Sequence, residues 1–481
     1  MAAPPQFLEY INLNKEAFID RLRDAVAHRS VSTDKQKVLK MREWLQQKLT
    51  EQDVIVSFPE PPNTDEPPYI LLGKIGTDAT KKTVLVYSHY DVMPVGLLVD
   101  GWNGPGEGTP EDRAFNLYRK DGKMYGRGSS DDKGPVTGWI NVLEAHKQKN
   151  PPLPVNIRFI FEGNEEIGSP GLDDFIAAEV KKGENGFFHS VDCVCITDNY
   201  WLTTRRPVLT YGVRGIAYFT MDITGATDDL HSGLYGRMIH EPMTDMVKLL
   251  SKLVEPSGEI TIPGVEAQVP PPTDDERKEY ELMDYSVTDL RKDTGGREVE
   301  LTENHADLLM GRMRFPSLSI HGIKGTFDTD DGLKTIIPAN ISARFSLRLV
   351  DPLTPDNIKP IVIDFLNSEF KKLNSKNKMV VHYQGGGFPW VGDRNHYNYK
   401  AAEAATKTIY GASLKPDYTR EGGSIPVSLT FSNLLGKNVL LLPMGQSDDG
   451  AHTKLEKLDE DNYINGTKVF GEYLYELARM Q

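Results

Sequence analysis

Five short segments between residues 89 and 452 place acidic or histidine side chains directly after apolar, strand-like runs. They contain His89 and Asp91 after TVLVYS, Asp131 in GRGSSDDKGP, Glu165 and Glu166 after VNIRFIFEGN, Asp198 after VDCVCIT, and His452 after NVLLLPMGQSDDGA. Because open α/β sheets collect ligands beyond the carboxyl ends of their strands, we expect these groups to meet in one crevice. The pattern predicts a site that holds two metal ions.

Imidazole nitrogen and carboxylate oxygen are ligands that suit both Zn²⁺ and Mn²⁺. Two such ions about 3.5–4 Å apart need a shared ligand. We assign His89 and Asp198 to one ion, Glu166 and His452 to the other, and Asp131 as the carboxylate that bridges them. Each ion then has three protein ligands and keeps positions open for water, which is typical of a catalytic rather than a structural site.

Glu165 and Glu166 are adjacent, and from a regular strand they cannot both point into the same coordination sphere. With Glu166 as a ligand, Glu165 is predicted to be the general base that takes a proton from the activated water and passes it to a leaving amine. Asp91, two residues beyond His89, is placed to accept a hydrogen bond from the second imidazole nitrogen and to fix its tautomer. These roles together indicate metal-assisted amide hydrolysis.

Each segment alone has a simpler structural interpretation. A single histidine at a strand end is usually a satisfied core or surface residue, and a lone Asp-Asp or Glu-Glu pair is usually a solvated turn. Their recurrence at several strand ends favours the metal site. GRGSSDDKG at residues 126–134 lacks the Rossmann and Walker spacings, and its two aspartates would repel phosphate. REGGSIP at residues 420–426 lacks the second glycine of a serine-hydrolase elbow.

At 481 residues the chain exceeds the roughly 250–300 residues at which a single core stops growing, so two domains are expected. Its net charge of −14, from 55 basic and 69 acidic residues, and the absence of a basic stripe interleaved with aromatics argue against a nucleic-acid partner.

No apolar run of about 18 residues is present, and the first residues lack the features of a signal peptide. Cys193 and Cys195 are expected as reduced core residues on one strand face. We therefore expect a cytoplasmic protein without a membrane partner.

Strand and helix patterns alternate over residues 1–208, which predicts an α/β sheet. Helices are expected within 7–52 and at 136–147 and 172–181, and strands at 69–74, 83–87 and 155–161. A second domain is expected at 209–385, with strands at 209–214, 216–224, 317–322 and 343–350 and helices at 242–254 and 355–373, before a hinge at the glycines 385–387. Residues 103–112 are expected to form a surface loop. Because His452 lies in the last part, residues 1–208 and 386–481 are predicted to form one discontinuous domain.

Further motifs are spread over nearly the whole chain: SHYDVMP (88–94), GRGSSDDKGPVTGWIN (126–141), FEGNEEIGSPGLD (161–173), ITDNYW (196–201), LTYGVRG (209–215), DLHSG (229–233), RFPSLSIHGI (314–323), KTIIPA (334–339) and REGGSIPVSLTF (420–431). Through these motifs the chain resembles the dinuclear metallopeptidase family of carnosinase, cytosolic nonspecific dipeptidase and fungal Cys-Gly dipeptidase, and the resemblance covers nearly its whole length. Ser88 and Met93 depart from the residues that relatives commonly have there, and the loop at 103–112 is longer than usual.

The resemblance implies the metal ligands assigned above, with Asp131 between the two ions, and Glu165 as the base. It further implies substrate-binding roles for His231 in DLHSG, Thr335 in KTIIPA, Arg348 in FSLRLV and Ser424 in GGSIP. Arg348 is suited to pair with the terminal carboxylate of a dipeptide, and His231 to stabilise the oxyanion. In this family the inserted domain is a lid that mediates dimerisation, so the resemblance implies a homodimer in which His231 acts in the partner's site.

These expectations combine into one hypothesis. The fold is α/β, with a discontinuous catalytic domain whose mixed, mostly parallel sheet is flanked by helices and with an inserted α+β lid and dimerisation domain. The function is metal-dependent hydrolysis of dipeptides such as Cys-Gly, in the cytoplasm and in glutathione degradation, with two Zn²⁺ or Mn²⁺ ions as cofactors. The alternatives are an N-acyl-amino-acid deacylase or carboxypeptidase of the same fold, and a catalytically silent metal-binding scaffold.

Overall fold

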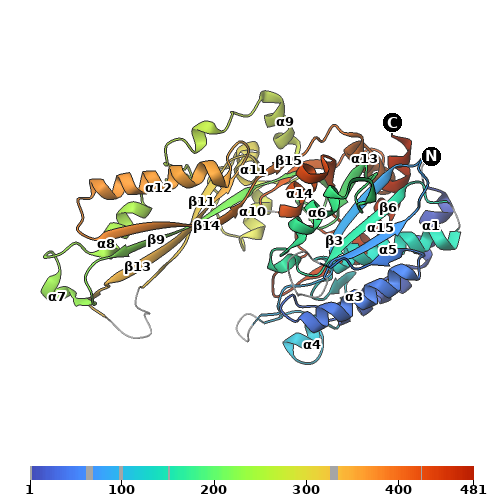
Figure 1. Ribbon diagram of the computed structural model, residues 1–481, viewed down its shortest axis with the longest axis horizontal. Helices are drawn as coiled ribbons and strands as arrows, with labels where there is room; N and C mark the ends of the chain where they lie inside the picture. The colour runs from blue at the N-terminus through green and yellow to red at the C-terminus, as the bar shows by residue number, and fades with distance from the viewer. Residues whose placement is uncertain are drawn as a thin grey trace. The chain divides into compact units, whose positions relative to one another are not determined.

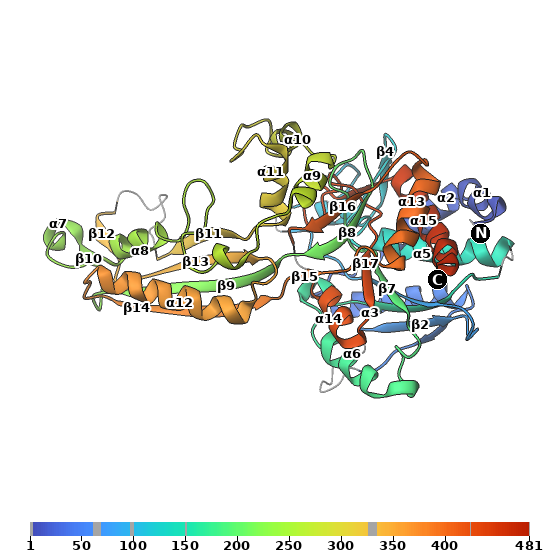
Figure 2. The ribbon, with the colours of Figure 1, turned by 90° about the horizontal axis from the view of Figure 1, so that it is seen from above.

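The computed structural model describes residues 3–60, 69–96, 101–149, 152–325, 334–423 and 425–480. The chain folds into two compact units (Figures 1 and 2). The first unit comprises Met1–Tyr211, Gly392–Thr419 and Thr430–Gln481, and the second comprises Gly212–Val391 and Arg420–Leu429. The second unit is therefore inserted into the first in two places along the sequence.

The unit limits differ from the predicted domain limits at the glycine run 385–387, where we expected a hinge. These glycines continue strand β14 (Lys378–Gly387) and pair antiparallel with β9 (Gly215–Thr224). A Cβ on Gly386 would collide with the carbonyl oxygen of Ile216, so the close approach of the two strands requires glycine there. The glycine run thus serves strand pairing rather than a hinge.

The segment Arg420–Leu429, which we expected in the catalytic domain, groups with the second unit. Its backbone explains the difference, because the amide of Arg214 donates to the carbonyl of Glu421 at 3.0 Å. The guanidinium of Arg214 also donates from Nε to the carbonyl of Gly422 at 3.2 Å. These long-range contacts cannot be read from local sequence patterns.

The first unit is built on a large mixed sheet. The strand order is β1-β2-β6-β3-β7-β17-β8, and β6, β3, β7 and β17 run parallel to one another. All residues of β3 are buried, as expected for a central strand covered on both faces. The strands of the large sheet are β1 (Ile55–Ser57), β2 (Leu71–Ile75), β3 (Thr83–His89), β6 (Asn156–Glu162), β7 (Cys193–Ile196), β8 (Val208–Val213), β16 (Asp417–Glu421) and β17 (Asn438–Leu441). A small three-stranded sheet has the order β18-β5-β4 and consists of β4 (Tyr118–Lys120), β5 (Lys123–Tyr125) and β18 (Lys457–Asp459). The predicted α/β class and mostly parallel sheet are confirmed.

Helices cover this sheet on both faces. On one face, Trp139 stacks on Phe470 with ring centroids 4.7 Å apart and meets Phe159 of β6 edge to face. On the other face, Tyr87 of β3 meets Phe431 edge to face. Figure 1 accordingly shows α5 and α14 on opposite sides of β3 and β6. The helices are α1 (Pro5–Leu13), α2 (Lys15–Ala27), α3 (Lys35–Thr50), α4 (Pro110–Ala114), α5 (Lys133–Lys149), α6 (Leu172–Lys181), α13 (Tyr397–Tyr410), α14 (Pro426–Leu435), α15 (Glu460–Arg479) and the 3-10 turns η1 (Glu165–Ile167) and η2 (Gly183–Asn185).

Three local expectations can be compared with this unit. The predicted loop at 103–112 ends in a short helix, α4, whose first turn is capped where Thr109 Oγ1 accepts from the amide of Asp112 at 3.1 Å. Cys193 and Cys195 are free and buried in β7, as expected. Among the described residues, none of the helices combines the length and the apolar character that crossing a bilayer requires.

The second unit contains a four-stranded antiparallel sheet in the order β11-β13-β9-β14. Helices α8 and α12 pack on one face of it and enclose an apolar core (Figure 2). The elements of this unit are β9, β10 (Leu230–His231), β11 (Ser317–Lys324), β12 (Ile336–Ile337), β13 (Asn340–Leu349), β14, β15 (Trp390–Val391), α7 (Ser232–Tyr235), α8 (Pro242–Leu250), η3 (Glu266–Gln268), α9 (Asp274–Leu282), α10 (Val287–Asp293), α11 (His305–Met313) and α12 (Pro355–Lys372). The predicted inserted α+β domain corresponds to this arrangement.

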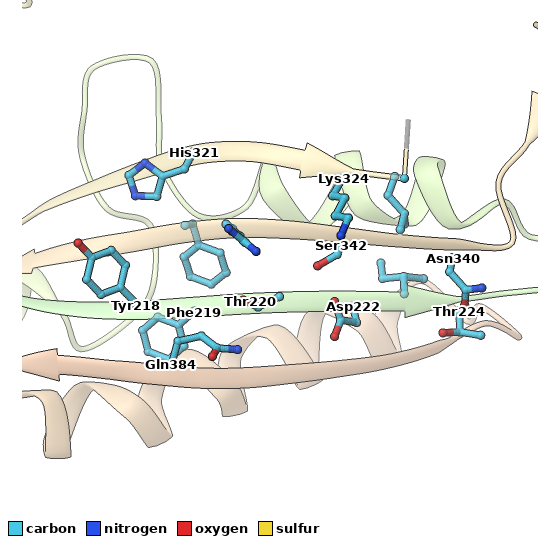
Figure 3. Close-up of a pocket in the computed structure, with 15 residues that line it drawn as sticks. Tyr218, Phe219, Thr220, Asp222, Thr224, His321, Lys324, Asn340, Ser342 and Gln384 are labelled. Carbon is cyan, nitrogen blue, oxygen red and sulfur yellow. The ribbon is translucent and has the colours of Figure 1, made fainter. Parts of the chain in front are cut away.

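The other face of the four-stranded sheet carries polar side chains. Along β9, Phe219 and Met221 are buried in the core beside the helices, so Thr220 and Asp222 point to the opposite face. That face forms an open pocket of about 1000 Å³, lined from all four strands by residues that include His321 of β11, Ser342 of β13 and Gln384 of β14 (Figure 3).

Candidate metal centre

Three of the predicted ligands follow neighbouring parallel strands. β3 ends at His89, and β6 and β7 pair with it in parallel on its two sides. Glu166 lies in η1 shortly after β6, and Asp198 follows β7. Because the carboxyl ends of parallel strands share one edge of the sheet, this pairing delivers the three side chains to the same place.

The other two predicted ligands come from loops. Asp131 lies just before α5, and His452 lies between β17 and β18. β17 pairs in parallel with β7, so the chain leaves it at the same edge of the sheet. The site is therefore assembled from five separate segments of the first unit.

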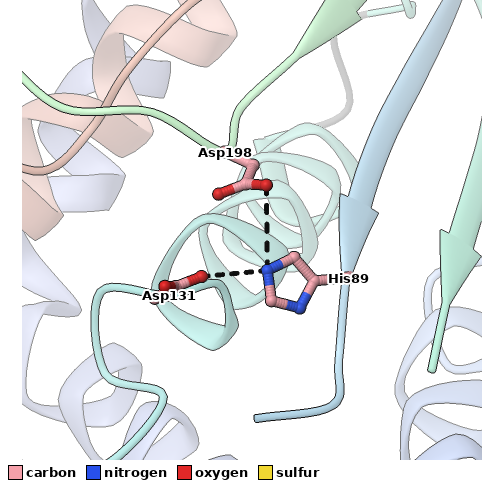
Figure 4. Close-up of side chains that lie close together, drawn as sticks. All are labelled: His89, Asp131 and Asp198. Atoms are coloured by element: carbon pink, nitrogen blue, oxygen red, sulfur yellow. Dashed lines mark hydrogen bonds and ion pairs between the residues drawn. The ribbon is translucent and has the colours of Figure 1, made fainter. Parts of the chain in front are cut away.

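The first group of donor atoms consists of His89, Asp131 and Asp198 (Figure 4). Nε2 of His89 lies 2.9 Å from Oδ1 of Asp131 and 3.8 Å from Oδ2 of Asp198. The imidazole of His89 is fully buried at the end of β3. One ring nitrogen and two carboxylate oxygens thus face a common point.

The second group consists of Asp131, Glu166 and His452. Nε2 of His452 lies 3.0 Å from Oδ2 of Asp131 and 2.9 Å from Oε2 of Glu166. The other oxygen of Glu166 accepts from the backbone amide of Met93 at 3.1 Å. Asp131 therefore directs one oxygen to each group, which is the geometry of a bridging carboxylate.

Asp91 is fully buried and its carboxylate does more than we expected from the sequence. Its two oxygens accept from the backbone amides of Glu165 and Glu166, each at 3.2 Å, and from Ser32 Oγ at 2.8 Å. Nδ1 of His89 lies 3.4 Å from the Asp91 carboxylate, but it is closer, at 3.1 Å, to the Asp91 backbone carbonyl. The residue thus fixes η1, which carries the predicted base, and also stands beside the imidazole.

The concentration of carboxylates shifts the pKa values of these groups. Burial raises the pKa of Glu165 to about 8 and holds the pKa of Asp198 well above its usual range. Hydrogen bonds to Asp131 and Glu166 raise the pKa of His452 to about 10. Burial lowers the pKa of His89, but its hydrogen bonds to Asp131 and Asp91 outweigh burial and the net shift is upward. The neighbouring carboxylates thus favour the protonated imidazoles, so a cation that binds here competes with protons for these nitrogens.

The donor set fits a pair of divalent ions. Each group offers one imidazole nitrogen and two carboxylate oxygens, and within each group the donor atoms lie within 4.8 Å of one another. Both Zn²⁺ and Mn²⁺ accept nitrogen and oxygen donors of this kind. Three protein ligands for each ion leave room for water or substrate.

The predicted substrate-binding residues lie in the second unit, except that Ser424 lies outside the described residues. His231 ends β10 and pairs with Ile336 of β12, and the backbone carbonyl of the neighbouring Thr335 accepts from the amide of Ser232 at 2.8 Å. Within this unit the structure thus brings His231 and Thr335 together.

Arg348 lies elsewhere in the second unit, near the end of β13, where it pairs with Ile216 of β9. Burial and the nearby charge of Arg348 lower the pKa of the Arg214 guanidinium to about 10. The large pocket on the open sheet face contains none of the predicted ligands or substrate residues among its lining residues. The pocket on the open sheet face is therefore not the predicted metal site.

Sequence reasoning did not single out two buried carboxylates beside the centre. Oδ2 of Asp132 accepts from the amide of His89 at 3.2 Å, and burial raises the pKa of Asp132 well above its usual range. Glu456 accepts from the amide of Asp131 at 3.1 Å. Asp132 stands in the motif that predicted Asp131, whereas Glu456 carries no sequence signal beyond being an acidic residue four positions after His452.

Comparison with known proteins identifies the family and confirms the resemblance. The model of peptidase family M20/M25/M40 matches residues 85–476. The Cys-Gly metallodipeptidase of Schizosaccharomyces pombe is 43% identical over 479 residues, which cover 98% of this chain and 97% of that protein.

Two solved structures are similar over nearly the whole chain. The dipeptidase Dug1p from Saccharomyces cerevisiae has a TM-score of 0.82 at 40% identity, covering 99% of this chain and 98% of that chain. Human carnosine dipeptidase 1 has a TM-score of 0.84 at 36% identity, with 100% of both chains covered. These similarities extend over both units of the fold.

The clustering of carboxylates predicts that divalent ions stabilise the protein. Adding Mn²⁺ or Zn²⁺ to chelator-treated protein should raise its thermal unfolding midpoint, since binding to the folded state contributes about 2.7 kcal/mol at one hundred times the dissociation constant. Differential scanning calorimetry measures the shift, and Asp131→Asn, which weakens both groups, should reduce it. An unchanged midpoint in the wild-type protein would contradict the assignment of these ligands.

Proposed function

The chain belongs to peptidase family M20/M25/M40, and from that premise we propose that it is a two-metal dipeptidase that hydrolyses the peptide bond of dipeptides such as Cys-Gly. The observation that carries the proposal is the carboxylate of Asp131, whose two oxygens face two separate imidazole-carboxylate groups. The full-length similarity to a Cys-Gly metallodipeptidase supports the substrate class. A silent scaffold is disfavoured because all five ligand positions and the base are present.

Two divalent ions in this centre would acidify a water molecule and polarise the scissile carbonyl. Glu165 takes a proton from the attacking water, whose oxygen bonds to the carbonyl carbon. The C–N bond then breaks, and Glu165 delivers the proton to the leaving amine. Asp91 holds the amide of Glu165 and so keeps the base in place.

Recognition of a dipeptide needs a partner for its free carboxylate. We assign this role to Arg348, because a guanidinium binds a carboxylate through two parallel hydrogen bonds. Thr335 and Ser424 are assigned to the substrate as polar contacts, on the strength of the matching motifs KTIIPA and GGSIP. His231 is assigned to the oxyanion of the tetrahedral intermediate. An acyl-amino acid has the same terminal carboxylate, so these contacts alone do not separate the two substrate classes.

A homodimer in which His231 enters the partner's site is part of the proposal. His231 is exposed, and its Nδ1 accepts from the amide of Gly233 at 2.9 Å, so Nε2 carries the ring proton and can donate a hydrogen bond to an oxyanion. Apolar side chains beside it are exposed as well, with 68% of Leu234 and 75% of Met238 accessible. Exposed apolar side chains clustered around a functional histidine are typical of a surface that a partner covers.

The identity of the ions, Zn²⁺ or Mn²⁺, stays a prediction of the donor chemistry. A cytoplasmic location and a place in glutathione degradation likewise stay predictions, supported by the similarity to a Cys-Gly metallodipeptidase.

The substrate class predicts a specific pattern of metal-dependent activity. Chelator-treated protein should cleave neither Cys-Gly nor β-Ala-His, and adding back Zn²⁺ or Mn²⁺ should restore cleavage of free dipeptides. Amine release measured for each ion and substrate tests this and identifies the working ion. Cleavage of an N-acetyl-amino acid alone would instead place the protein among the deacylases, and no cleavage despite bound metal would favour the scaffold.

Replacement of the base separates catalysis from metal binding. Glu165→Gln should lower kcat by about 10²–10⁴-fold, because the amide cannot accept the proton from water. The number of ions bound per chain, measured by elemental analysis, should stay unchanged. Glu184→Gln, at an exposed position in η2, is the control and should retain activity. Wild-type turnover in Glu165→Gln would exclude Glu165 as the base.

The dimer proposal predicts complementation between two inactive variants. His231→Ala and Glu165→Gln chains, each inactive alone, should recover activity when co-expressed with different affinity tags and purified as the mixed dimer. In that dimer one centre retains its own Glu165 and receives His231 from the other chain. A mixed dimer without activity, or a protein that is monomeric by light scattering, would contradict the assignment of His231 in trans.

A further inference from the structure

Glu456 is a fully buried glutamate whose carboxylate collects an unusual number of donors. Oε2 accepts from Arg127 Nη1 at 2.9 Å and from the amide of Gly128 at 2.8 Å. Oε1 accepts from the amide of Ser130 at 2.9 Å, from Ser130 Oγ at 3.1 Å and from the amide of Asp131 at 3.1 Å. Five hydrogen bonds thus converge on one side chain.

This set of donors excludes Glu456 as a metal ligand. An ionised carboxylate has about four lone-pair sites, and five donors already occupy them. The buried charge is compensated by the guanidinium of Arg127, which is itself only 3% exposed. A buried ion pair is favourable when further hydrogen bonds satisfy the remaining lone pairs, and the three backbone amides do so here.

The network around Glu456 reaches three of the five ligand-bearing segments. It holds the amide of Asp131 directly. Arg127 uses its second nitrogen, Nη2, to donate to the carbonyl of Thr453 at 2.8 Å, next to His452. The hydroxyl of Tyr200, shortly after Asp198, donates to Ser130 Oγ at 3.3 Å. The segments of Asp131, His452 and Asp198 are therefore joined through one carboxylate.

The backbone of the Asp131 loop is shaped for this contact. Gly128 has a φ of +81°, a conformation that L side chains rarely adopt, and a Cβ there would lie 2.6 Å from Val92 Cγ1. That conformation lets the Gly128 amide point at Glu456 together with the amides of Ser130 and Asp131. The backbone carbonyl of Glu456 in turn accepts from the amide of Gly126 at 3.1 Å. The loop that carries Asp131 is thus hydrogen-bonded to both the side chain and the backbone of Glu456.

We propose that Glu456 is a positioning residue that orients the bridging carboxylate of Asp131 and thereby couples the two metal positions. This inference rests on the proposed two-metal function. Asp131 bridges only if its two oxygens face His89 and His452 at the same time, as they do at 2.9 and 3.0 Å. Glu456 holds the amide of Asp131 directly and is linked through Arg127 to the segment of His452, so it keeps the two oxygens of Asp131 facing both imidazoles.

Glu456→Gln tests the proposal with almost no change in volume. A glutamine has one acceptor oxygen, so its NH₂ group must face either Arg127 and Gly128 or the donors of Ser130 and Asp131. Two or three buried donors then lose their acceptor. Loss of such a supporting contact typically weakens metal binding or activity by about 10–100-fold.

The measurement is Mn²⁺ binding to the full chain, followed by electron paramagnetic resonance. Two bridged ions give an exchange-coupled spectrum, whereas a single ion gives the six-line spectrum of isolated Mn²⁺. Wild-type protein should show the coupled spectrum at two equivalents. Glu456→Gln should bind the second ion about 10–100-fold more weakly and show mainly the six-line spectrum at the same loading. Its kcat for a dipeptide should fall with little change in KM.

Two matched controls separate this effect from general loss of stability. Glu472→Gln changes another fully buried glutamate, which lies in α15 and accepts from the amide of Ala3 at 2.9 Å. It should retain the coupled spectrum. Ser130→Ala removes a hydroxyl of the network, whereas Ser129→Ala removes a buried hydroxyl that has no hydrogen-bond partner among the described residues. Only Ser130→Ala should weaken binding of the second ion. If Glu456→Gln does not fold, the comparison of Ser130→Ala with Ser129→Ala tests the proposal in its place.

The outcomes distinguish the inference from the function on which it rests. A wild-type protein that binds fewer than two ions would contradict the two-metal proposal itself. A coupled wild-type spectrum that persists unchanged in Glu456→Gln would overturn only the role of Glu456. If Glu456→Gln does not fold, equal spectra for Ser130→Ala and Ser129→Ala overturn it.

Discussion

Parallel pairing of β6, β3 and β7 forces the chain segments after three strands to the same edge of one sheet. Backbone hydrogen bonding sets this constraint, and the positions of His89, Glu166 and Asp198 follow from it. β17 extends the parallel set and leads to the loop that carries His452. Helices on both faces keep these strands buried, so the ligand positions are held by the core of the first unit rather than by the loops alone.

Convergence at this edge has an electrostatic consequence. Several buried carboxylates lie close together, and burial alone disfavours their charged forms. Two arrangements offset this cost: Asp131 shares its oxygens between His89 and His452, and Asp91 accepts backbone amides and a serine hydroxyl. Divalent cations would complete the compensation. The same concentration of negative charge therefore favours the binding of divalent cations at this edge of the sheet.

The five predicted ligands could be named from the sequence because each carries a side chain with metal-binding chemistry, and His89, Glu166 and Asp198 also follow strand signals. The supporting residues could not be predicted in the same way. Glu456 and Arg127 have no local pattern that distinguishes them from surface charges, and their importance arises from contacts across more than 300 residues of sequence, since they pair at a separation of 329. The glycines 385–387 were interpreted as a hinge because their sequence is compatible with one, yet strand pairing with β9 uses them instead.

By itself the sequence determined the α/β class, the family and the residue types of the site, because periodicity, strand-end chemistry and motif spacing are local properties. The tertiary structure alone decided that Glu456 accepts the amide of Asp131, that the Asp91 carboxylate accepts the amides of η1, and that Arg420–Leu429 groups with the inserted unit. These facts depend on which distant segments pack together and at what register. Such contacts are fixed by burial and backbone hydrogen bonding over the whole chain, and no short window of sequence contains them.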